Sequence, residues 1–158
     1  MRILTVLLIV GLAAPAAARS VEDDAVGYWL TENGKAIVHF TPCEDGVASA
    51  AKPGICGQIV WTENPRDETG ALKRDAQNPD EALRDRAICG LPLVGDLKLA
   101  SGNQLKDGWI YNPRSGDTFG AEAELVSAEK LKLRGFLGIS LLGQSQVWTR
   151  VKDDRGGC

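Results

Sequence analysis

The chain has 158 residues, of which 44% are hydrophobic, 25% charged and 6% aromatic, a composition typical of one globular domain. Its 18 basic residues are outnumbered by 21 acidic residues, so the formal charge is −3 and there is no basic excess for a nucleic-acid backbone. These values argue against a nucleic-acid-binding protein and against a wholly disordered chain.

The N-terminus has the pattern of a secretory signal peptide. Arg2 precedes an apolar run from Ile3 to Ala18 that ends in three alanines, which fits a basic start, an apolar centre and a small-residue cleavage site. We predict a signal peptide at residues 1–18, cleaved after about Ala18, and then a charged segment at residues 19–26. An uncleaved anchor helix is the alternative, but the run is short for a membrane span. The processed protein is expected to be periplasmic or secreted, without a transmembrane span.

From Gly27 onward, short apolar or alternating runs are separated by turn residues, which is the spacing of an all-β domain. Leu131 and Leu133, for example, alternate with basic residues, as in a strand with one dry and one wet face. The domain is predicted at residues 27–151, followed by a flexible tail at 152–158. The pattern predicts about eight strands, at residues 27–31, 35–41, 55–62, 93–99, 109–112, 118–126, 130–137 and 144–151.

One long, charged segment, residues 63–87, interrupts this series of strands and turns and is expected to lie outside the sheet. Within it, Asn78 can cap a helix and Pro79 suits the first helical position, so we predict a short helix through about Arg84. Two interpretations of the segment remain open, a lid over a barrel mouth and a solvated connection.

The four cysteines allow three pairings if all are oxidised, which export would permit. Cys43 follows one predicted strand and Cys56 lies in the next, so a hairpin brings them face to face, and closing that loop contributes about 3 kcal/mol. Cys89 and Cys158 are left over, and Cys158 could reach Cys89, pair between molecules or stay free. A metal site is disfavoured because the chain has one His and no Cys-x-x-Cys motif.

Two features at opposite ends of the domain predict a closed up-and-down barrel. Gly27 and Trp29 lie in the first strand, and Arg150 lies in the last. Because the first and last strands of such a barrel are neighbours, Arg150 is expected to lie across the Trp29 indole and seal that end. A Gly-x-Trp near the start with an Arg in the last strand resembles the calycin signature shared by lipocalins, fatty-acid-binding proteins and avidins.

The rest of the domain is similar to a bacterial family of short exported proteins catalogued as a domain of unknown function. This resemblance implies a lipocalin-like, antiparallel β-barrel, exported to the periplasm or beyond, and it implies no established reaction. The segments that carry it are GKAIV at 34–38, CGQIVW at 56–61, NPD at 78–80 with Leu83 and Arg84, CGL at 89–91, GWIYNP at 108–113, and the stretch 135–150 from GFLG to WTR.

Candidate catalytic groups are few. His39 is alone in its strand, and Ser140 lacks the second glycine of a nucleophile elbow. Glu122 and Glu124 share a strand face and are expected to face water. No catalytic residue, cofactor or metal is therefore predicted, and a hydrolase using His39 or Ser140 ranks third among the functional hypotheses.

A binding function requires fewer specific residues than catalysis does, because a barrel of about eight strands can hold one small ligand. The first hypothesis is a non-catalytic protein of the bacterial envelope that binds a small apolar or amphipathic molecule. The second is an interaction or structural module with a filled barrel, whose protein partner the sequence does not identify. The aromatic residues predicted to line the ligand site are Phe40, Trp61, Trp109, Tyr111 and Phe119.

Overall fold

The computed structural model describes residues 21–44 and 54–158. The predicted signal peptide at residues 1–18 lies outside the described residues. Within the two described ranges, no helix is long and apolar enough to cross a membrane.

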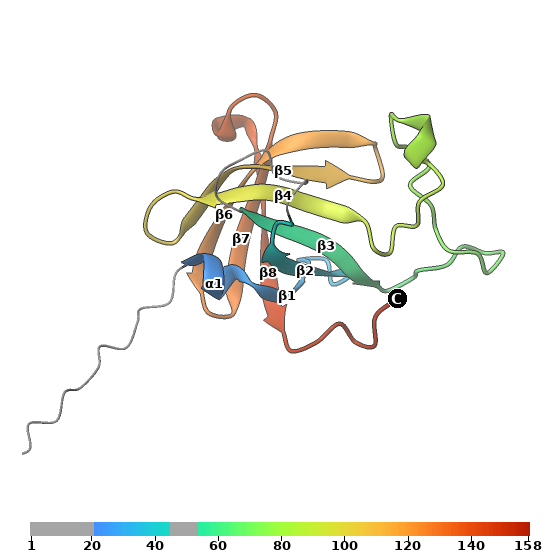
Figure 1. Ribbon diagram of the computed structural model, residues 1–158, viewed down its shortest axis with the longest axis horizontal. Helices are drawn as coiled ribbons and strands as arrows, with labels where there is room; N and C mark the ends of the chain where they lie inside the picture. The colour runs from blue at the N-terminus through green and yellow to red at the C-terminus, as the bar shows by residue number, and fades with distance from the viewer. Residues whose placement is uncertain (1–20, 45–53) are drawn as a thin grey trace, which may run out of the picture.

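The described chain forms one closed, antiparallel, eight-stranded barrel in which each strand pairs with the next along the sequence (Figure 1). Pairing of Trp29 in β1 with Arg150 in β8 completes the ring. The lipocalin-like, all-β fold expected from the sequence is therefore confirmed. The strands are β1 (Gly27–Leu30), β2 (Ala36–Pro42), β3 (Ile55–Thr62), β4 (Pro92–Leu99), β5 (Gln104–Asn112), β6 (Asp117–Ser127), β7 (Lys130–Phe136) and β8 (Gln144–Val151).

Three large aromatic side chains fill one end of the barrel. Trp29, Phe40 and Trp148 have at most 1% of their surface exposed, and the rings of Phe40 and Trp148 meet edge to face with centroids 6.0 Å apart. Gly57 makes room for Phe40, because a Cβ there would lie 2.9 Å from Val38 and closer still to the Phe40 ring. This end of the barrel is a packed core.

The same end is closed by Arg150. Its guanidinium carbon lies 4.2 Å from the centre of the Trp29 ring, and its nitrogens donate to the carbonyls of Ala128, Val26 and Asp24. The Trp29 indole nitrogen donates to the Ala25 carbonyl at 2.8 Å. Arg150 in β8 therefore connects the segment just before β1 with the turn between β6 and β7.

In the described part of the chain, three short helices lie outside the strands. α1 (Val21–Ala25) falls in the charged segment before the barrel, where no helix was predicted. η1 (Glu81–Leu83) is the helix expected in the long loop, but it is a shorter 3₁₀ turn that begins at Asp80, whose carboxylate accepts from the Ala82 amide. Asn78 lies two residues before this cap, and its Oδ1 accepts from the Asp80 amide at 2.9 Å while its Nδ2 donates to Asp75 and Tyr111. η2 (Ser140–Leu142) lies between β7 and β8.

Two disulfides use all four cysteines. Cys43 pairs with Cys56 across β2 and β3, with Cα atoms 4.9 Å apart. Cys158 pairs with Cys89, so the end of the chain is attached to the long loop. Because disulfides persist in oxidising compartments, the two bonds point to a location outside the cytoplasm.

Candidate functional site

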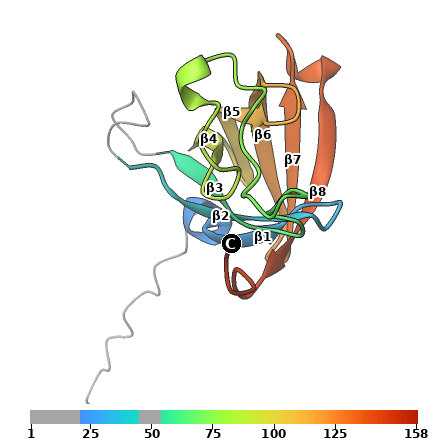
Figure 2. The same cartoon turned by 90° about the vertical axis from the view of Figure 1, so that its right-hand side faces the viewer.

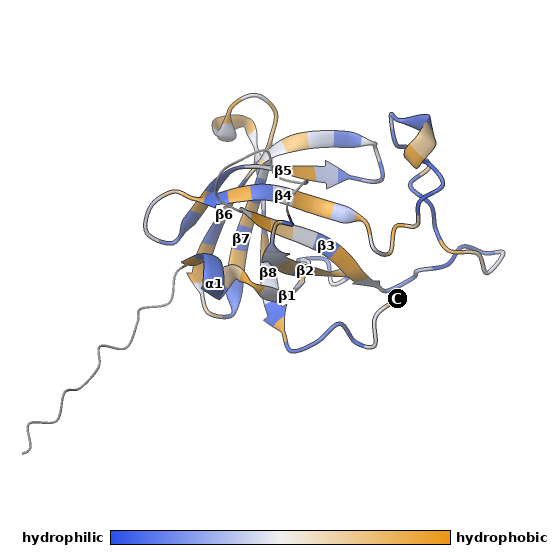
Figure 3. Ribbon diagram, in the orientation of Figure 1, coloured by the Kyte–Doolittle hydropathy of each residue, from blue (hydrophilic) through white to orange (hydrophobic). Residues whose placement is uncertain are grey.

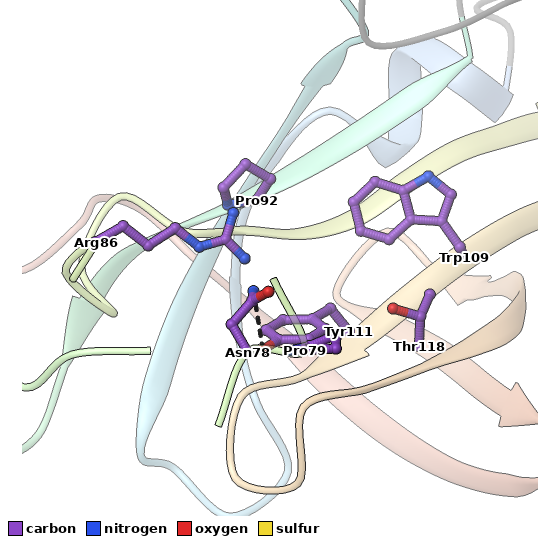
Figure 4. Close-up of a pocket in the computed structure, with 7 residues that line it drawn as sticks. All are labelled: Asn78, Pro79, Arg86, Pro92, Trp109, Tyr111 and Thr118. Atoms are coloured by element: carbon purple, nitrogen blue, oxygen red, sulfur yellow. Dashed lines mark hydrogen bonds between the residues drawn. The ribbon is translucent and has the colours of Figure 1, made fainter. Parts of the chain in front are cut away.

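A cleft of about 360 Å³ lies where the long loop between β3 and β4 meets the barrel (Figure 4). We call it the loop cleft. β4, β5 and β6 supply one wall and the loop supplies the other. Its lining residues are Asn78, Pro79, Arg86, Pro92, Trp109, Tyr111 and Thr118.

The barrel wall of the loop cleft is the outer face of the sheet. Ala121 and Ala123 of β6 are buried in the core, so the alternate positions of that strand face outward. Trp109 pairs with Gly120, and Tyr111 pairs with Thr118. Both aromatic side chains therefore project from the outside of the barrel.

Trp109 lies against the sheet because β4 has a glycine opposite it. Gly95 pairs with Trp109, and a Cβ on Gly95 would come within 2.6 Å of the indole nitrogen. The indole thus packs over the Gly95 backbone and also lines the cleft.

The loop wall is a strip of chain folded back on itself. Arg74 and Ala87 form an isolated antiparallel bridge, and the Asp75 amide donates to the Arg86 carbonyl at 3.0 Å. The Arg84 side chain donates to the Asn78 carbonyl at 2.8 Å. This folding brings the side chains of Asp75, Asn78 and Arg86 together at the base of the cleft.

A buried carboxylate joins the two walls. Asp75 has no exposed surface; its Oδ1 accepts from the Tyr111 hydroxyl at 2.7 Å. Its Oδ2 accepts from Asn78 Nδ2 and from Arg86 Nε, both at 2.8 Å. Arg86 Nη2 is also 2.8 Å from Oδ2, so Arg86 and Asp75 form an ion pair, and most of the arginine side chain is covered. The guanidinium carbon of Arg86 is also 5.6 Å from the centre of the Tyr111 ring.

The ionisation of this network follows from its contacts. Burial raises the pKa of Asp75, but the hydrogen bonds from Asn78, Tyr111 and Arg86, together with the Arg86 charge, outweigh burial and leave the pKa below its usual value. Burial raises the pKa of Tyr111, and its hydrogen bond to the carboxylate raises it further. At neutral pH the cleft is therefore lined by the Arg86 guanidinium and the neutral Tyr111 phenol, with the opposite charge of Asp75 buried behind them.

The turn between β5 and β6 holds the loop in place. Gly116 lies in this turn with φ +78°, and a Cβ there would collide with the Gln77 carbonyl. A glycine is needed at this position for both reasons, because other residues disfavour positive φ and would push the loop away. The cleft residues Asn78 and Pro79 come directly after this contact.

The five aromatic residues predicted to line a ligand site are not brought together. Trp109 and Tyr111 line the loop cleft, whereas Phe40 is part of the packed core. Phe119 pairs with Ile110 on the inner face of the sheet. Trp61 lies under the C-terminal tail, with the Arg155 guanidinium 4.9 Å over its ring.

The candidate catalytic residues have other partners. His39 stacks on Tyr28 with ring centroids 4.2 Å apart, and the Ser140 hydroxyl donates to Glu122 at 2.7 Å. Among the described residues, no group of three or more His, Cys, Asp or Glu side chains is placed to hold a metal ion.

Sequence reasoning missed five of the lining residues, Asn78, Pro79, Arg86, Pro92 and Thr118, and it missed Asp75 behind them. Asp75 and Arg86 sit in a charged segment where most such residues face water, and nothing in their spacing marks them as buried. Tyr111 is 36 positions from Asp75, so the pair appears only once the loop is folded.

The comparisons with known proteins agree with the fold. A family described as "Uncharacterized protein conserved in bacteria (DUF2147)" matches residues 27–150. The solved structure "Protein HP1028 from the human pathogen Helicobacter pylori belongs to the lipocalin family" superposes with a TM-score of 0.64 at 22% identity. The match covers 82% of this chain and 84% of that one, and at this identity it establishes the fold alone. No curated protein sequence is significantly similar to the chain.

Proposed function

The chain belongs to the bacterial DUF2147 family, and we propose that it is an exported, non-catalytic protein that binds a small amphipathic molecule in the loop cleft. The signal peptide predicted at residues 1–18 and the two disulfides support a periplasmic or secreted location. The lipocalin-like fold supports a small ligand in general terms.

The observation that carries this proposal is the composition of the cleft. Ring surface from Trp109 and Tyr111 lies beside polar groups of Asn78, Arg86 and Thr118, the mixture that orients a ligand with an apolar body and a polar end. Its volume of about 360 Å³ suits a small molecule. Since Asp75 neutralises Arg86, the site favours ligands with little net charge.

The test uses N-phenyl-1-naphthylamine as a probe, because it carries no net charge, its rings match the Trp109 surface and its fluorescence reports burial. We expect saturable binding of one probe, with one adduct seen by native mass spectrometry. Trp109→Ala should weaken binding about tenfold or more, as expected for loss of a central aromatic contact.

Two further variants keep the result interpretable. Thr118→Trp fills the cleft without removing packing and should also weaken binding, whereas Trp61→Ala removes an indole outside the cleft and should leave binding unchanged. Equal affinity in wild type and Thr118→Trp, or equal losses in Trp109→Ala and Trp61→Ala, contradicts binding at this cleft.

The second candidate, an envelope interaction module with a filled barrel, is favoured by a specific observation. Trp29, Phe40 and Trp148 are almost fully buried at one end of the barrel, where their rings occupy space that an interior ligand would need. Absence of any bound probe or co-purified molecule would support this candidate over the first.

A further inference from the structure

The hairpin between β7 and β8 exposes more apolar surface than its surroundings. Four large side chains within six residues are solvent-facing: Leu137 is 66% exposed, Ile139 59%, Leu141 83% and Leu142 73%. We call these four residues the apolar tip. The loop of this hairpin projects beyond the ends of the strands that it joins (Figure 3).

The apolar tip is held in shape by polar groups behind it. Arg134 of β7 donates from Nε to the Ser140 carbonyl at 2.7 Å and from Nη2 to the Leu141 carbonyl at 3.2 Å. The Ser140 hydroxyl donates to Glu122 of β6 at 2.7 Å. Charged side chains thus fix a loop whose own apolar side chains are largely left uncovered.

Four backbone carbonyls of the tip also accept hydrogen bonds from within the hairpin. The carbonyls of Leu137, Ile139 and Ser140 accept from the amides of Ile139, Leu142 and Gly143, and Arg134 occupies the Leu141 carbonyl. Hydrogen bonds of this kind are what a lipid environment demands, because the acyl region supplies no partner for a free carbonyl.

We propose that the apolar tip inserts shallowly into a lipid surface. A second copy of the chain fits the tip poorly, because four partly exposed side chains offer on the order of 300 Å², well below the roughly 800 Å² per partner of a stable interface. Shallow lipid insertion needs only this much surface and gives weak, reversible attachment.

The tip would also orient the molecule. The last residue of β7, Phe136, pairs with Gly120 near the start of β6. The turn just before β6 contains Gly116, which lies against Gln77 of the long loop. Figure 2 shows the long loop and the η2 hairpin at the same end of the barrel. Docking through the tip therefore turns the end that carries the loop cleft toward the lipid.

The test measures co-sedimentation of the exported protein, purified from the periplasm of an expression host, with phosphatidylcholine vesicles. The wild type should partition into the vesicle pellet. Its binding should change little with salt, because insertion depends on apolar surface and the chain is net negative. The double variant L141S/L142S should reduce partitioning about tenfold or more.

The matched control is L99S/V126S, which removes two apolar side chains that are 44% and 56% exposed near the closed end of the barrel. It should bind vesicles like the wild type, and circular dichroism should show all variants folded. No vesicle binding by wild type, or equal binding by L141S/L142S, overturns the proposal. Sedimentation equilibrium showing a dimer that L141S/L142S abolishes would overturn it in favour of a second copy.

Discussion

Asp75 ties the long loop to the barrel through one carboxylate. Its oxygens accept from Tyr111, Asn78 and Arg86 at 2.7–2.8 Å, so a side chain with no exposed surface keeps its charge. Removing one member of such a network leaves another buried without its partner, which is the costly case. The position of the loop therefore depends on the ionisation of Asp75.

This dependence predicts a stability loss in acid. Because the folded-state pKa of Asp75 lies below the unfolded value of about 3.9, its contribution is complete above that value and is lost as pH falls through the folded pKa. Asp75→Asn should be destabilised by about 3 kcal/mol at pH 7, and the difference from wild type should shrink below about pH 4.

Urea denaturation followed by tryptophan fluorescence from neutral to acid pH measures this difference. Asp85→Asn is the control, since Asp85 is an exposed carboxylate beside Arg86 in the chain and should show little change at any pH. A gap between wild type and Asp75→Asn that stays constant across the acid range would contradict the role given to the ionised carboxylate.

At the residue scale, prediction succeeded where topology decides the contact. Trp29 and Arg150 lie near opposite ends of the chain, and their approach follows from closing an up-and-down barrel. Asp75 had no such signal, because it is one acidic residue in a segment of many. Trp109 was predicted as a ligand contact, but on the inner face, because the sequence does not show on which side of the sheet an aromatic pair lies.

At the element scale, the disulfide between Cys89 and Cys158 fixes the long loop between β3 and β4 to the C-terminal tail after β8. Cys89 lies between the cleft residues Arg86 and Pro92, so the bond restrains the loop wall of the cleft. It closes a sequence separation of 69 residues, which corresponds to about 4 kcal/mol in the chain-entropy account.

The double variant C89S/C158S should therefore lose stability and also bind N-phenyl-1-naphthylamine more weakly. C43S/C56S is the matched control, because it removes a disulfide between β2 and β3 and should cost about 3 kcal/mol with little effect on the probe. Guanidinium denaturation and probe titration measure the two effects separately. Equal probe affinity in both variants would show that the bond does not shape the cleft.

The strands were predictable because alternation and turns mark them, and outside β5 the structure moves their ends by at most one residue. β5 is the exception, since it begins at Gln104 and the prediction began at Trp109. Asp107 has φ +60° within this strand, and the pairing with β6 shifts between Leu105 and Gly108. This irregularity breaks the two-residue period from which a strand is recognised.

At the scale of the whole molecule, the barrel has two different ends. One is packed by Trp29, Phe40 and Trp148 and closed by Arg150. The other carries the long loop, the loop cleft and the apolar tip. The resemblance and the closing residues pointed to the ring of strands, but the cleft depends on how an irregular loop folds against the outer face, and local sequence pattern carries little information about that.

Closure of the ring predicts a large effect for one conservative change. Arg150→Lys keeps the charge but loses the planar fork that reaches the Ala128, Val26 and Asp24 carbonyls while stacking on Trp29. We expect a loss of about 2–4 kcal/mol and faster amide hydrogen exchange in β1 and β8, the strands that meet at the closure. Arg155→Lys makes the same substitution at another arginine over a tryptophan, Trp61, in the exposed tail, and should lose much less. Similar denaturation midpoints for the two variants, with unchanged exchange in β1 and β8, would mean that strand pairing alone keeps the barrel shut.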